Sequence, residues 1–420
     1  MKIIVAHPGK QHSFRVAKAL KDAGLLYKYA TTVYNKDSSI LMRFIKLFLG
    51  KDNYARAQRR KCPSLVDEDV IQFCELEGLL LLALIRIDFT HRYSDLFNEY
   101  ISRKFQRKLA KYIIRNNVDM VISYDTNSTV LFSILKEKAP NVIRVMDNAH
   151  PNRHYLYHSY HEHWDCVGPF GDTLTACGYL TNLERAKSFG EEAKLAHYHI
   201  VASSYSQKAL EFDGIKSYTI FKIPYGVDNN KFVESGRCYD ATHLNVLFMG
   251  EVNQRKGIRQ LLEAAKEINS KEVVFNIVGA GTDYCASLYD PYKTYVNLWG
   301  YVSFEELLNQ LKNNHIFVFP TMGEGFGLVL LEAMAAGLVP ITTRNCGGAD
   351  IVEDGVNGFL IEVGDTDAIV EKIMWCKSHP EELKVMSQRA IETAHQFTWQ
   401  KYEENLIISC RGMFQMATQA

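Results

Sequence analysis

One segment of the sequence, residues 320–337, combines two carboxylates with closely spaced glycines. It reads PTMGEGFGLVLLEAMAAG, in which Glu324 and Glu332 stand eight positions apart. Gly325 and Gly327 would let backbone N–H groups approach a ligand closely, and the N-terminus of the helix that follows would favour an anion. The segment therefore predicts a cradle for a phosphate group or a sugar hydroxyl.

Glu332 is the one polar residue of an otherwise apolar helical stretch, residues 328–336. That pattern predicts a helix that is buried on nearly all sides. A buried carboxylate costs several kcal/mol unless hydrogen bonds satisfy it. Two interpretations stay open at this point: the paired hydroxyls of a ribose satisfy the carboxylate, or the amides of a neighbouring loop do so.

Short apolar runs recur along the whole chain, and helical patterns separate them. Such alternation predicts βαβ units and parallel, doubly wound sheets. A boundary near residues 222–230 gives two such units, whose ligands would bind at the carboxyl ends of the strands, in a cleft between the units. The expected strands are residues 2–6, 120–123, 142–146 and 198–202 in the first unit and 245–249, 273–278, 296–299, 316–319 and 339–342 in the second, and the expected helices include 258–268, 304–312 and much of 40–116.

Length and composition bound the class of protein. A chain of 420 residues is long enough for two or three domains, and 23% charged with 47% hydrophobic residues excludes a disordered, collagen-like or disulfide-scaffold protein. The net charge is zero, which argues against a general nucleic-acid binder. That zero hides an asymmetry, because residues 1–220 carry 31 basic and 23 acidic side chains and residues 221–420 carry 17 and 25. Two units with different partners are indicated.

The nine cysteines are odd in number and form no C-x-x-C pair, so neither a zinc site nor a disulfide framework is expected. The apolar run at the N-terminus is too short for a signal peptide, and the longest aliphatic run, residues 79–85, is far shorter than a membrane span. We therefore expect a cytoplasmic protein, with peripheral contact at the inner face of the membrane left open.

The order E-G-F-G-L-x-x-x-E-A-M-A-x-G from Glu324 to Gly337 resembles the E-x7-E signature of the family 4 retaining glycosyltransferases. Those enzymes have the GT-B fold, in which two Rossmann-like doubly wound domains face each other across a cleft. The resemblance covers the C-terminal half almost throughout and the first half weakly. It also rests on I-P-Y-G-V-D at 223–228, F-M-G at 248–250, R-K-G at 255–257, V-G-A-G at 278–281, L-W-G-Y-V at 298–302 and V-N-G-F-L at 356–360.

The resemblance implies an α/β chain with a particular division of labour. Residues 1–222 would form the acceptor-binding domain and residues 223–398 the domain that binds the nucleotide-sugar donor. A helix at about 399–420 would cross back to the first domain. Neither a cofactor nor a bound metal is implied, because positive side chains and helix N-terminal amides would stabilise the leaving phosphate instead.

Within the donor domain, the resemblance gives roles to individual residues. Arg255 and Lys256 would clamp the diphosphate, although an Arg-Lys pair in a solvated loop is the ordinary alternative. Glu332 would bind the ribose hydroxyls, and Glu324 would lie beside the donor sugar. The other implied donor contacts are Gly250, Gly279, Tyr301, Val302, Gly325, Phe326, Gly327 and Leu328. Residues 278–281 also look like part of a dinucleotide fingerprint, but the third glycine is missing, so NAD is not expected.

Two loops of the first half follow expected strands and would face the cleft. His7-Pro8-Gly9-Lys10-Gln11-His12 makes Gly9, Lys10 and His12 candidate acceptor contacts. The second loop contains Asp147 and His150. His150 is the candidate beside the donor sugar, and Asp147 is either its orienting partner or the true equivalent. Tyr124 and Asp125, at the end of another strand, are further acceptor candidates.

Three features of the first half admit competing interpretations. Asp67-Glu68-Asp69 could suggest a metal site but is more typical of an acidic helix N-terminus. The four histidines between 154 and 163 have no compact ligand spacing, so no metal is expected. In residues 101–115, one face is apolar and the opposite face is basic, which fits either contact with anionic lipid or packing on the domain core.

The sequence thus leads to a retaining hexosyltransferase that moves a sugar from a UDP- or GDP-sugar to a glycan, a lipid-linked saccharide or a small acceptor. Surface polysaccharide or glycolipid synthesis is the expected setting. The alternatives are a non-catalytic GT-B subunit that binds nucleotide sugars or carbohydrate, and a GT-B epimerase or phosphorylase. No nucleic acid is expected as a partner.

Overall fold

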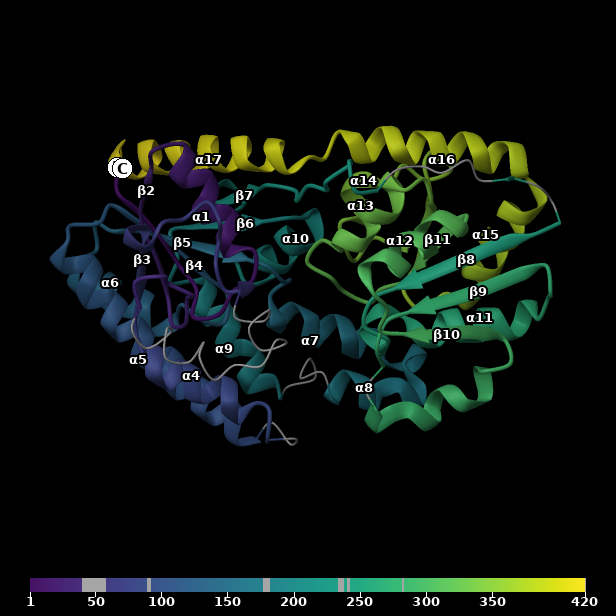
Figure 1. The fold of residues 1–420 in the computed structure, drawn as a ribbon, viewed down its shortest axis with the longest axis horizontal. Coiled ribbons are helices and arrows are strands. Elements are labelled where there is room, and N and C mark those ends of the chain that lie inside the picture. Colours follow the sequence, from purple (N-terminus) through teal and green to yellow (C-terminus); the bar gives the residue numbers. More distant parts are fainter. Residues whose placement is uncertain are drawn as a thin grey trace.

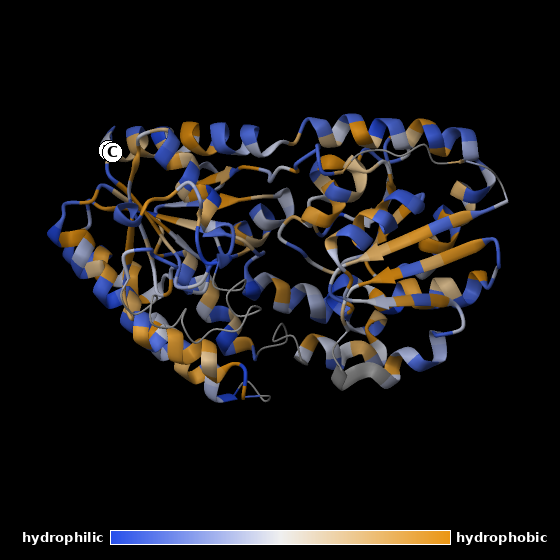
Figure 2. Ribbon diagram, in the orientation of Figure 1, coloured by the Kyte–Doolittle hydropathy of each residue, from blue (hydrophilic) through white to orange (hydrophobic). Residues whose placement is uncertain are grey.

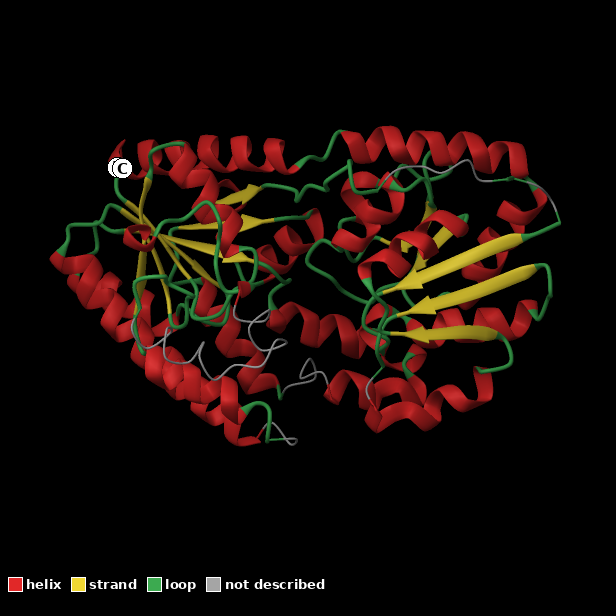
Figure 3. Cartoon of the chain, in the orientation of Figure 1, coloured by secondary structure: helices red, strands yellow, loops and turns green. Residues whose placement is uncertain are grey.

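Two parallel β-sheets, each covered by helices, form the computed structural model of the chain (Figure 1; Figure 3). It describes residues 1–39, 58–88, 92–176, 182–232, 238–239, 242–281 and 283–419, and the side chains of 176 and 283–286 are excepted. Part of the expected helical stretch 40–116 therefore lies outside the described residues.

The first sheet has seven parallel strands in the order β3-β2-β1-β4-β5-β6-β7. The residues of β1, β4, β5 and β6 are all buried, since helices cover both faces, and this explains their continuous apolar runs. The strands are β1 Ile3–Ala6, β2 Leu26–Thr31, β3 Val70–Gln72, β4 Met120–Tyr124, β5 Ile143–Asn148, β6 Tyr198–Val201 and β7 Ile220–Lys222.

The second sheet has six parallel strands in the order β10-β9-β8-β11-β12-β13. Strands β8 and β9 are mostly orange in Figure 2, the colour of apolar residues. The strands are β8 Leu244–Met249, β9 Val273–Val278, β10 Val296–Gly300, β11 Ile316–Phe319, β12 Val339–Thr343 and β13 Phe359–Ile361. Every strand expected from the sequence is present, and the predicted pair of doubly wound parallel sheets is confirmed.

The helices lie between successive strands and on both faces of the sheets. Those of the first half are α1 Ser13–Asp22, α4 Glu75–Leu84, α5 Arg92–Arg115, α6 Thr129–Lys138, α7 Arg153–Glu162, α8 Gly171–Ala176, α9 Leu183–Ala193 and α10 Ser204–Phe212. Those of the second half are α11 Ile258–Ile268, α12 Phe304–Asn313, α13 Leu328–Ala335, α14 Gly348–Ile351, α15 Thr366–Ser378, α16 Pro380–His395 and α17 Trp399–Gln419.

The chain passes between the two units at two segments that contact each other. The backbone N–H of Val227 donates to the carbonyl of Phe397 at 2.9 Å. A Cβ atom on Gly226 would lie 2.2 Å from the carbonyl carbon of Thr398, so only glycine allows this approach. After this crossing, α17 runs along the first unit in line with α16 (Figure 1) and packs against α1.

An arm of the first half, residues 164–176, packs on the second unit. The backbone N–H of Gln254 donates to the hydroxyl of Thr173 at 2.9 Å, and Arg259 donates to the carbonyl of Cys166 at 2.8 Å. The ring of Phe170 contacts that of Tyr289. The division of the chain at residue 222 stays a prediction. With that division, residues 164–176 belong to the first part but pack on the second.

The amphipathic helix of residues 101–115 forms the C-terminal part of α5. Ile101, Phe105, Leu109 and Ile113 are buried in the core of the first unit. The apolar face is thus occupied by the protein itself, which supports packing on the domain core over insertion into lipid. Among the described helices, none is long and apolar enough to cross a membrane.

The described part of residues 40–116 is mostly helical, as expected, since it contains α4 and α5, although the three-residue strand β3 also lies within it. One sequence-based expectation for this segment needs correction. Asp67-Glu68-Asp69 does not begin a long helix: it forms a single 3-10 turn, η1, directly before β3. Asp67 accepts hydrogen bonds from the backbone N–H groups of Asp37 and Ser38, so the cluster fastens a preceding loop.

Candidate functional site

Arg255, Lys256 and Glu324 meet at the carboxyl edge of the second sheet. The two cations lie in η5, the 3-10 turn Gln254–Lys256 after β8, and Glu324 lies in the loop after β11. Arg255 Nη1 is 2.7 Å from Glu324 Oε2, and the ammonium of Lys256 pairs with the same oxygen. Arg255 is 6% exposed and Lys256 8%, so this pair is not a solvated loop.

The loop that holds the cations is fixed to the loop that holds Glu324. The carbonyl of Arg255 accepts hydrogen bonds from the Thr321 hydroxyl and the Met322 N–H, both at 2.9 Å. Gly257 has φ of +73°, and a Cβ atom there would lie 2.0 Å from the carbonyl oxygen of Pro320. The sequence Arg-Lys-Gly thus turns tightly against β11, which orients both cations rigidly.

Burial and the adjacent Arg255 guanidinium lower the pKa of Lys256 well below its usual value. The Glu324 carboxylate in contact with the ammonium opposes this effect. A bound anion at the same place would add negative charge and favour the protonated ammonium further. The cluster is therefore a cationic site whose charge is offset by Glu324 and, at 3.8 Å from Arg255, by Glu251.

The helix α13 begins at the predicted cradle. Gly327 precedes it with φ of +83°, and the first N–H groups of the helix have no intrahelical acceptor. The Glu324 N–H donates to the carbonyl of Asn345 at 2.9 Å, which holds the loop open beside the helix N-terminus. An anion placed there would meet both backbone donors and the positive end of the helix dipole.

Glu332 lies one turn into α13 and is half-buried. Burial raises the pKa of its carboxyl. No hydrogen bond to the carboxylate comes from the described part of the chain. The alternative in which amides of a neighbouring loop donate to the Glu332 carboxylate is therefore not observed among the described residues.

Two glycines allow the segments that follow β8 and β9 to approach each other closely at the same edge of the sheet. Gly250 and Gly279 both have φ of +142°, and a Cβ atom on Gly279 would lie 1.7 Å from the carbonyl oxygen of Gly250. A Cβ atom on Gly250 itself would meet nothing within 4 Å, so this glycine leaves open space beside the cations. Tyr301, after β10, is 89% exposed, and the adjacent Val302 is half-buried.

Across the interface, the first unit contributes a pair formed by the partly buried His12 and the buried Asp147. His12 Nε2 is 2.8 Å from Asp147 Oδ2, and the rings of Tyr124 and Tyr225 pack against the imidazole. Burial alone would lower the pKa of His12, but the Asp147 carboxylate outweighs it and raises the pKa. One sequence-based alternative made Asp147 the orienting partner of His150. The structure instead pairs Asp147 with His12.

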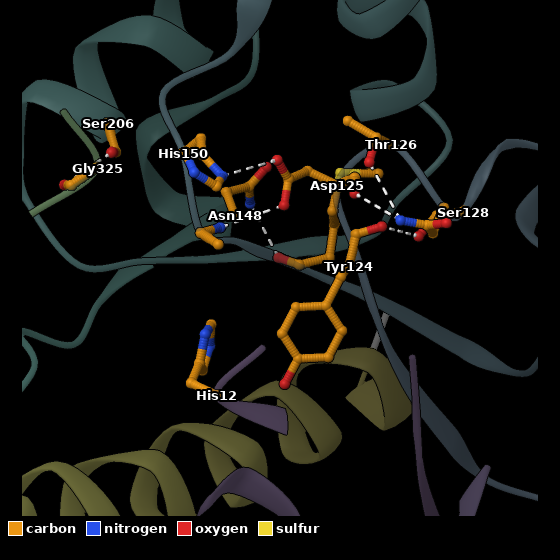
Figure 4. A network of polar contacts seen from close by, with 12 residues as sticks. His12, Tyr124, Asp125, Thr126, Ser128, Asn148, His150, Ser206 and Gly325 are labelled. Carbon is orange, nitrogen blue, oxygen red and sulfur yellow. Dashed lines mark hydrogen bonds and ion pairs between the residues drawn. The ribbon is translucent and has the colours of Figure 1, made fainter. Parts of the chain in front are cut away.

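His150 instead lies beside Asp125, with 4.0 Å between Nδ1 and Oδ2 (Figure 4). Burial, with added repulsion from Arg255, Arg153 and Lys256, lowers the pKa of His150 to about 4. Burial and the nearby Glu192 carboxylate raise the pKa of Asp125 to about 7. His150 is thus neutral at pH 7, because Arg255 and Lys256 of the second unit add to the effect of burial and disfavour its protonated form.

The loop of Gly325 joins the two units at this point. Its carbonyl accepts hydrogen bonds from the hydroxyls of Ser203, at 2.5 Å, and Ser206, at 3.1 Å. A Cβ atom on Gly325 would lie 2.1 Å from the carbonyl oxygen of Ala149. Sequence reasoning had placed Ser203 only at a helix start, and its serine-rich N-cap was the one available signal.

The remaining candidates are less closely grouped. The Gly9 N–H donates to His7 Nδ1, and the ammonium of Lys10 is exposed and lies over the ring of Phe14. His154 pairs with Asp213. Among the described residues there is no cluster of three or more His, Cys, Asp or Glu side chains able to hold a metal ion.

Comparison with known proteins finds similarity for the second unit. Residues 243–378 match the family described as "Glycosyl transferases group 1". The chain is 32% identical over 163 residues to an uncharacterised glycosyltransferase of Methanocaldococcus jannaschii, which is 37% of this chain and 44% of that one. It is 34% identical over 156 residues to the capsular polysaccharide biosynthesis glycosyltransferase CapM of Staphylococcus aureus, 36% and 40% of the two chains. The chain thus spans less than half the length of these relatives.

A solved structure extends the likeness to the whole chain. The Anabaena protein HepE, in complex with UDP and glucose, superposes with a TM-score of 0.63 over 98% of this chain and 100% of that one. The sequence identity is 16%, so this likeness shows the fold alone. The expected GT-B architecture is confirmed.

Proposed function

We propose, from the match of residues 243–378 to the group 1 glycosyltransferases, that the chain transfers a sugar from a nucleotide-diphosphate sugar to a saccharide acceptor. UDP- or GDP-hexoses are the proposed donors. The proposed setting is synthesis of a surface polysaccharide or glycolipid. CapM, a relative named for capsular polysaccharide biosynthesis, supports this setting.

The buried cluster of Arg255, Lys256 and Glu324 is the observation that carries the proposal. Departure of a nucleoside diphosphate builds negative charge, and cations held rigidly in a desolvated site stabilise that charge strongly. Glu324 offsets both cations in the absence of a ligand. A donor diphosphate would take over this contact, and Glu324 would then be free to bind the donor sugar.

The α13 helix supplies the other donor contacts. Its N-terminal amides, from Phe326 to Leu328, would hold phosphate or sugar oxygens. Glu332, half-buried and without a hydrogen-bond donor among the described residues, would accept hydrogen bonds from the two ribose hydroxyls. The open space over Gly250 would take the phosphates, and Tyr301 and Val302 would flank the base through backbone groups.

Retention of the anomeric configuration is proposed to occur by front-face substitution. The bond from the anomeric carbon to the phosphate oxygen breaks, the bond to the acceptor oxygen forms on the same face, and the proton of the acceptor hydroxyl passes to the leaving phosphate. Asp147, the buried carboxylate of the first unit, is engaged by His12 and is thus a poor covalent nucleophile. His150, neutral at pH 7, could accept a hydrogen bond from a sugar hydroxyl.

Release of nucleoside diphosphate from UDP-, GDP- and ADP-sugars by the purified full chain tests the proposal. Turnover of at least one donor, lost on Glu324→Gln together with Arg255→Ala, is expected. Binding of a nucleotide sugar without release would favour a non-catalytic GT-B subunit instead. Conversion of the donor into an epimeric sugar without an acceptor would favour an epimerase.

No resident metal is proposed for this reaction, since Arg255, Lys256 and the helix N-terminus would do the work of stabilising the leaving group. Addition of a chelator is expected to leave turnover unchanged. Contact of the basic face of α5 with an anionic membrane is proposed only as a charge-dependent surface contact, because the apolar residues of α5 from Ile101 to Ile113 are buried in the core.

A further inference from the structure

A cavity of about 810 Å³ lies in the first unit, between the N-terminal half of α5, the start of α6, and α9. Its volume falls within the range of roughly 300–1,000 Å³ that is usual for small-molecule sites. None of the candidate donor or acceptor residues described above lines it. Thr126 and Arg153 do, and they follow closely on Asp125 and His150. The cavity therefore begins beside the His150–Asp125 pair.

The wall at the start of α6 is built from two buried side chains. The Glu192 carboxylate accepts hydrogen bonds from the N–H groups of Thr126, Ser128 and Thr129, at 2.8 to 2.9 Å. Gln106 accepts from the next two N–H groups of the helix, at 2.9 and 3.0 Å. The helix N-terminus is thus already occupied, and no anion can use it.

At Thr126, the cavity wall has a backbone conformation that is energetically unfavourable for this residue type. The φ of Thr126 is +69°, an uncommon conformation for a β-branched residue. The Glu192 carboxylate fixes the N–H of this residue, which carries on directly from Asp125 (Figure 4). Residues held in such conformations cluster at ligand sites. The cavity wall and the turn that presents Asp125 are therefore one rigid structure.

The cavity is lined by three cations and three carboxylates. The cations are Arg103, Arg153 and Arg185, and the carboxylates are Asp95, Glu99 and Glu192. Arg103 pairs with Glu99 at 2.6 Å, and the Arg153 guanidinium lies over the ring of Phe189, 5.0 Å from its centroid. An anionic ligand would meet Asp95 and Glu99, whereas hydroxyl groups can donate to the carboxylates and accept from the guanidinium groups.

We propose that this cavity binds the uncharged sugar units of the acceptor that lie behind the unit whose hydroxyl reacts. The inference rests on the proposed function, of which it names the acceptor class: an uncharged oligosaccharide. The cavity adjoins the His150–Asp125 pair, offers donors and acceptors to hydroxyl groups, and has room for more than one sugar ring. The net positive charge of residues 1–220 therefore does not determine which acceptor binds in this cavity.

Saturation-transfer NMR and calorimetry on the full chain test the proposal. The probes are uncharged trisaccharides of gluco, galacto, manno and N-acetylglucosamino configuration, with trigalacturonate as the charged probe. Ser188→Trp fills the cavity from α9, and Glu99→Ala removes a hydroxyl acceptor from α5. Ser133→Trp is the matched control, because Ser133 is exposed on α6 and does not line the cavity.

At least one uncharged trisaccharide is expected to bind the wild-type chain. We expect its affinity to fall about tenfold or more in Ser188→Trp, to fall in Glu99→Ala, and to stay within about twofold in Ser133→Trp. Absence of binding by every uncharged probe, equal binding to Ser188→Trp, or binding of trigalacturonate alone would each overturn the inference.

Stabilisation by UDP, GDP and ADP is measured on the same four proteins. It reports the donor site, which the cavity variants do not touch, and it also shows that each variant is folded. Nucleotide stabilisation without saccharide binding means that the cavity assignment fails and the proposed function stands. Saccharide binding without nucleotide stabilisation means that the proposed donor chemistry fails and a carbohydrate site remains.

Discussion

His12 Nε2 lies 2.8 Å from the carboxylate of Asp147, although 135 positions separate the two residues in the sequence. One follows β1 and the other ends β5, strands that are separated in the sheet by β4. Tyr225 of the segment between the units packs on the same imidazole. The pair therefore links the first unit to the crossing of the chain.

The first prediction concerns the pH dependence of stability that this pair confers. The pKa of His12 is raised in the folded chain, so protonation of His12 favours folding. The stabilisation should be fully present below the ordinary histidine pKa of about 6.5 and be lost as the pH rises through the raised value. Asp147→Asn should remove it, which urea unfolding between pH 5.5 and 9 would detect.

A double-mutant cycle of His12→Asn with Asp147→Asn is expected to give a coupling free energy of about 1–3 kcal/mol at pH 6. Lys194 and Glu191 are the matched control, since their N–O distance is 2.7 Å but their side chains are 48% and 71% exposed. Removing that exposed pair should cost less than about 0.5 kcal/mol. Equal coupling in the two cycles would contradict the role given to burial.

The second prediction concerns the cationic cluster. Replacing both Arg255 and Lys256 by Ala should weaken binding of nucleoside diphosphates about 100-fold or more, since each charge-assisted hydrogen bond contributes about 1.5–3 kcal/mol. Calorimetry with UDP and GDP measures this loss. Lys266→Ala, an exposed cation of α11, is the control and should leave the affinity unchanged. Retained nucleotide affinity in the double variant would show that the diphosphate lies elsewhere.

The third prediction separates stability from binding at Glu332. Burial raises the pKa of this carboxyl, so its ionised form costs stability above the ordinary value of 4.5. Glu332→Gln should therefore keep or raise Tm at pH 7 while it weakens donor affinity, because the amide accepts fewer hydrogen bonds from a ribose. Exposed Glu267, changed to Gln, should alter neither quantity. Unchanged donor affinity in Glu332→Gln would refute the ribose role.

The central strands could be predicted from the sequence because burial on both faces demands continuous apolar runs. β9 and β11 begin and end at the expected residues. β3, β7 and β13 were not expected, since each has only three residues. β2 was missed because it is partly exposed and contains Lys28 and two tyrosines, which weakens its apolar pattern.

The candidate site was predictable where its residues are close in sequence and much less so where strand order brings them together. Glu324 and Glu332 belong to one loop and helix, so their spacing was visible. The partner of Asp147 was not, because the pairing with His12 depends on β1 and β5 ending at one edge of the sheet. Ser203 and Ser206, which hold Gly325 from the other unit, gave no signal beyond helix capping.

The fourth prediction concerns Asp125. Burial and the neighbouring Glu192 raise its pKa to about 7, Asp147 adds repulsion, and Arg153 opposes the shift. Because a raised carboxyl pKa favours the protonated folded state, stability should fall as the pH rises from about 4 through 7. Asp125→Asn should remove this loss, so its Tm should exceed that of the wild type at pH 8 and approach it near pH 4. Parallel Tm profiles of the two proteins would contradict the raised pKa.

The final prediction concerns the membrane. The apolar residues of α5 from Ile101 to Ile113 are buried, so lipid binding through this part of the helix would come from its basic face, which includes Arg103, Arg107 and Lys108. Binding of this kind is screened by salt, with a Debye length of about 10 Å at 0.1 M. In a sedimentation assay, the chain should therefore pellet with anionic vesicles at low salt and stay in the supernatant at about 0.5 M salt. Arg107→Glu with Lys108→Glu should abolish retention, whereas the same reversal at Lys293 and Lys312 of the second unit should not. Retention that resists salt would instead require an apolar anchor elsewhere in the chain.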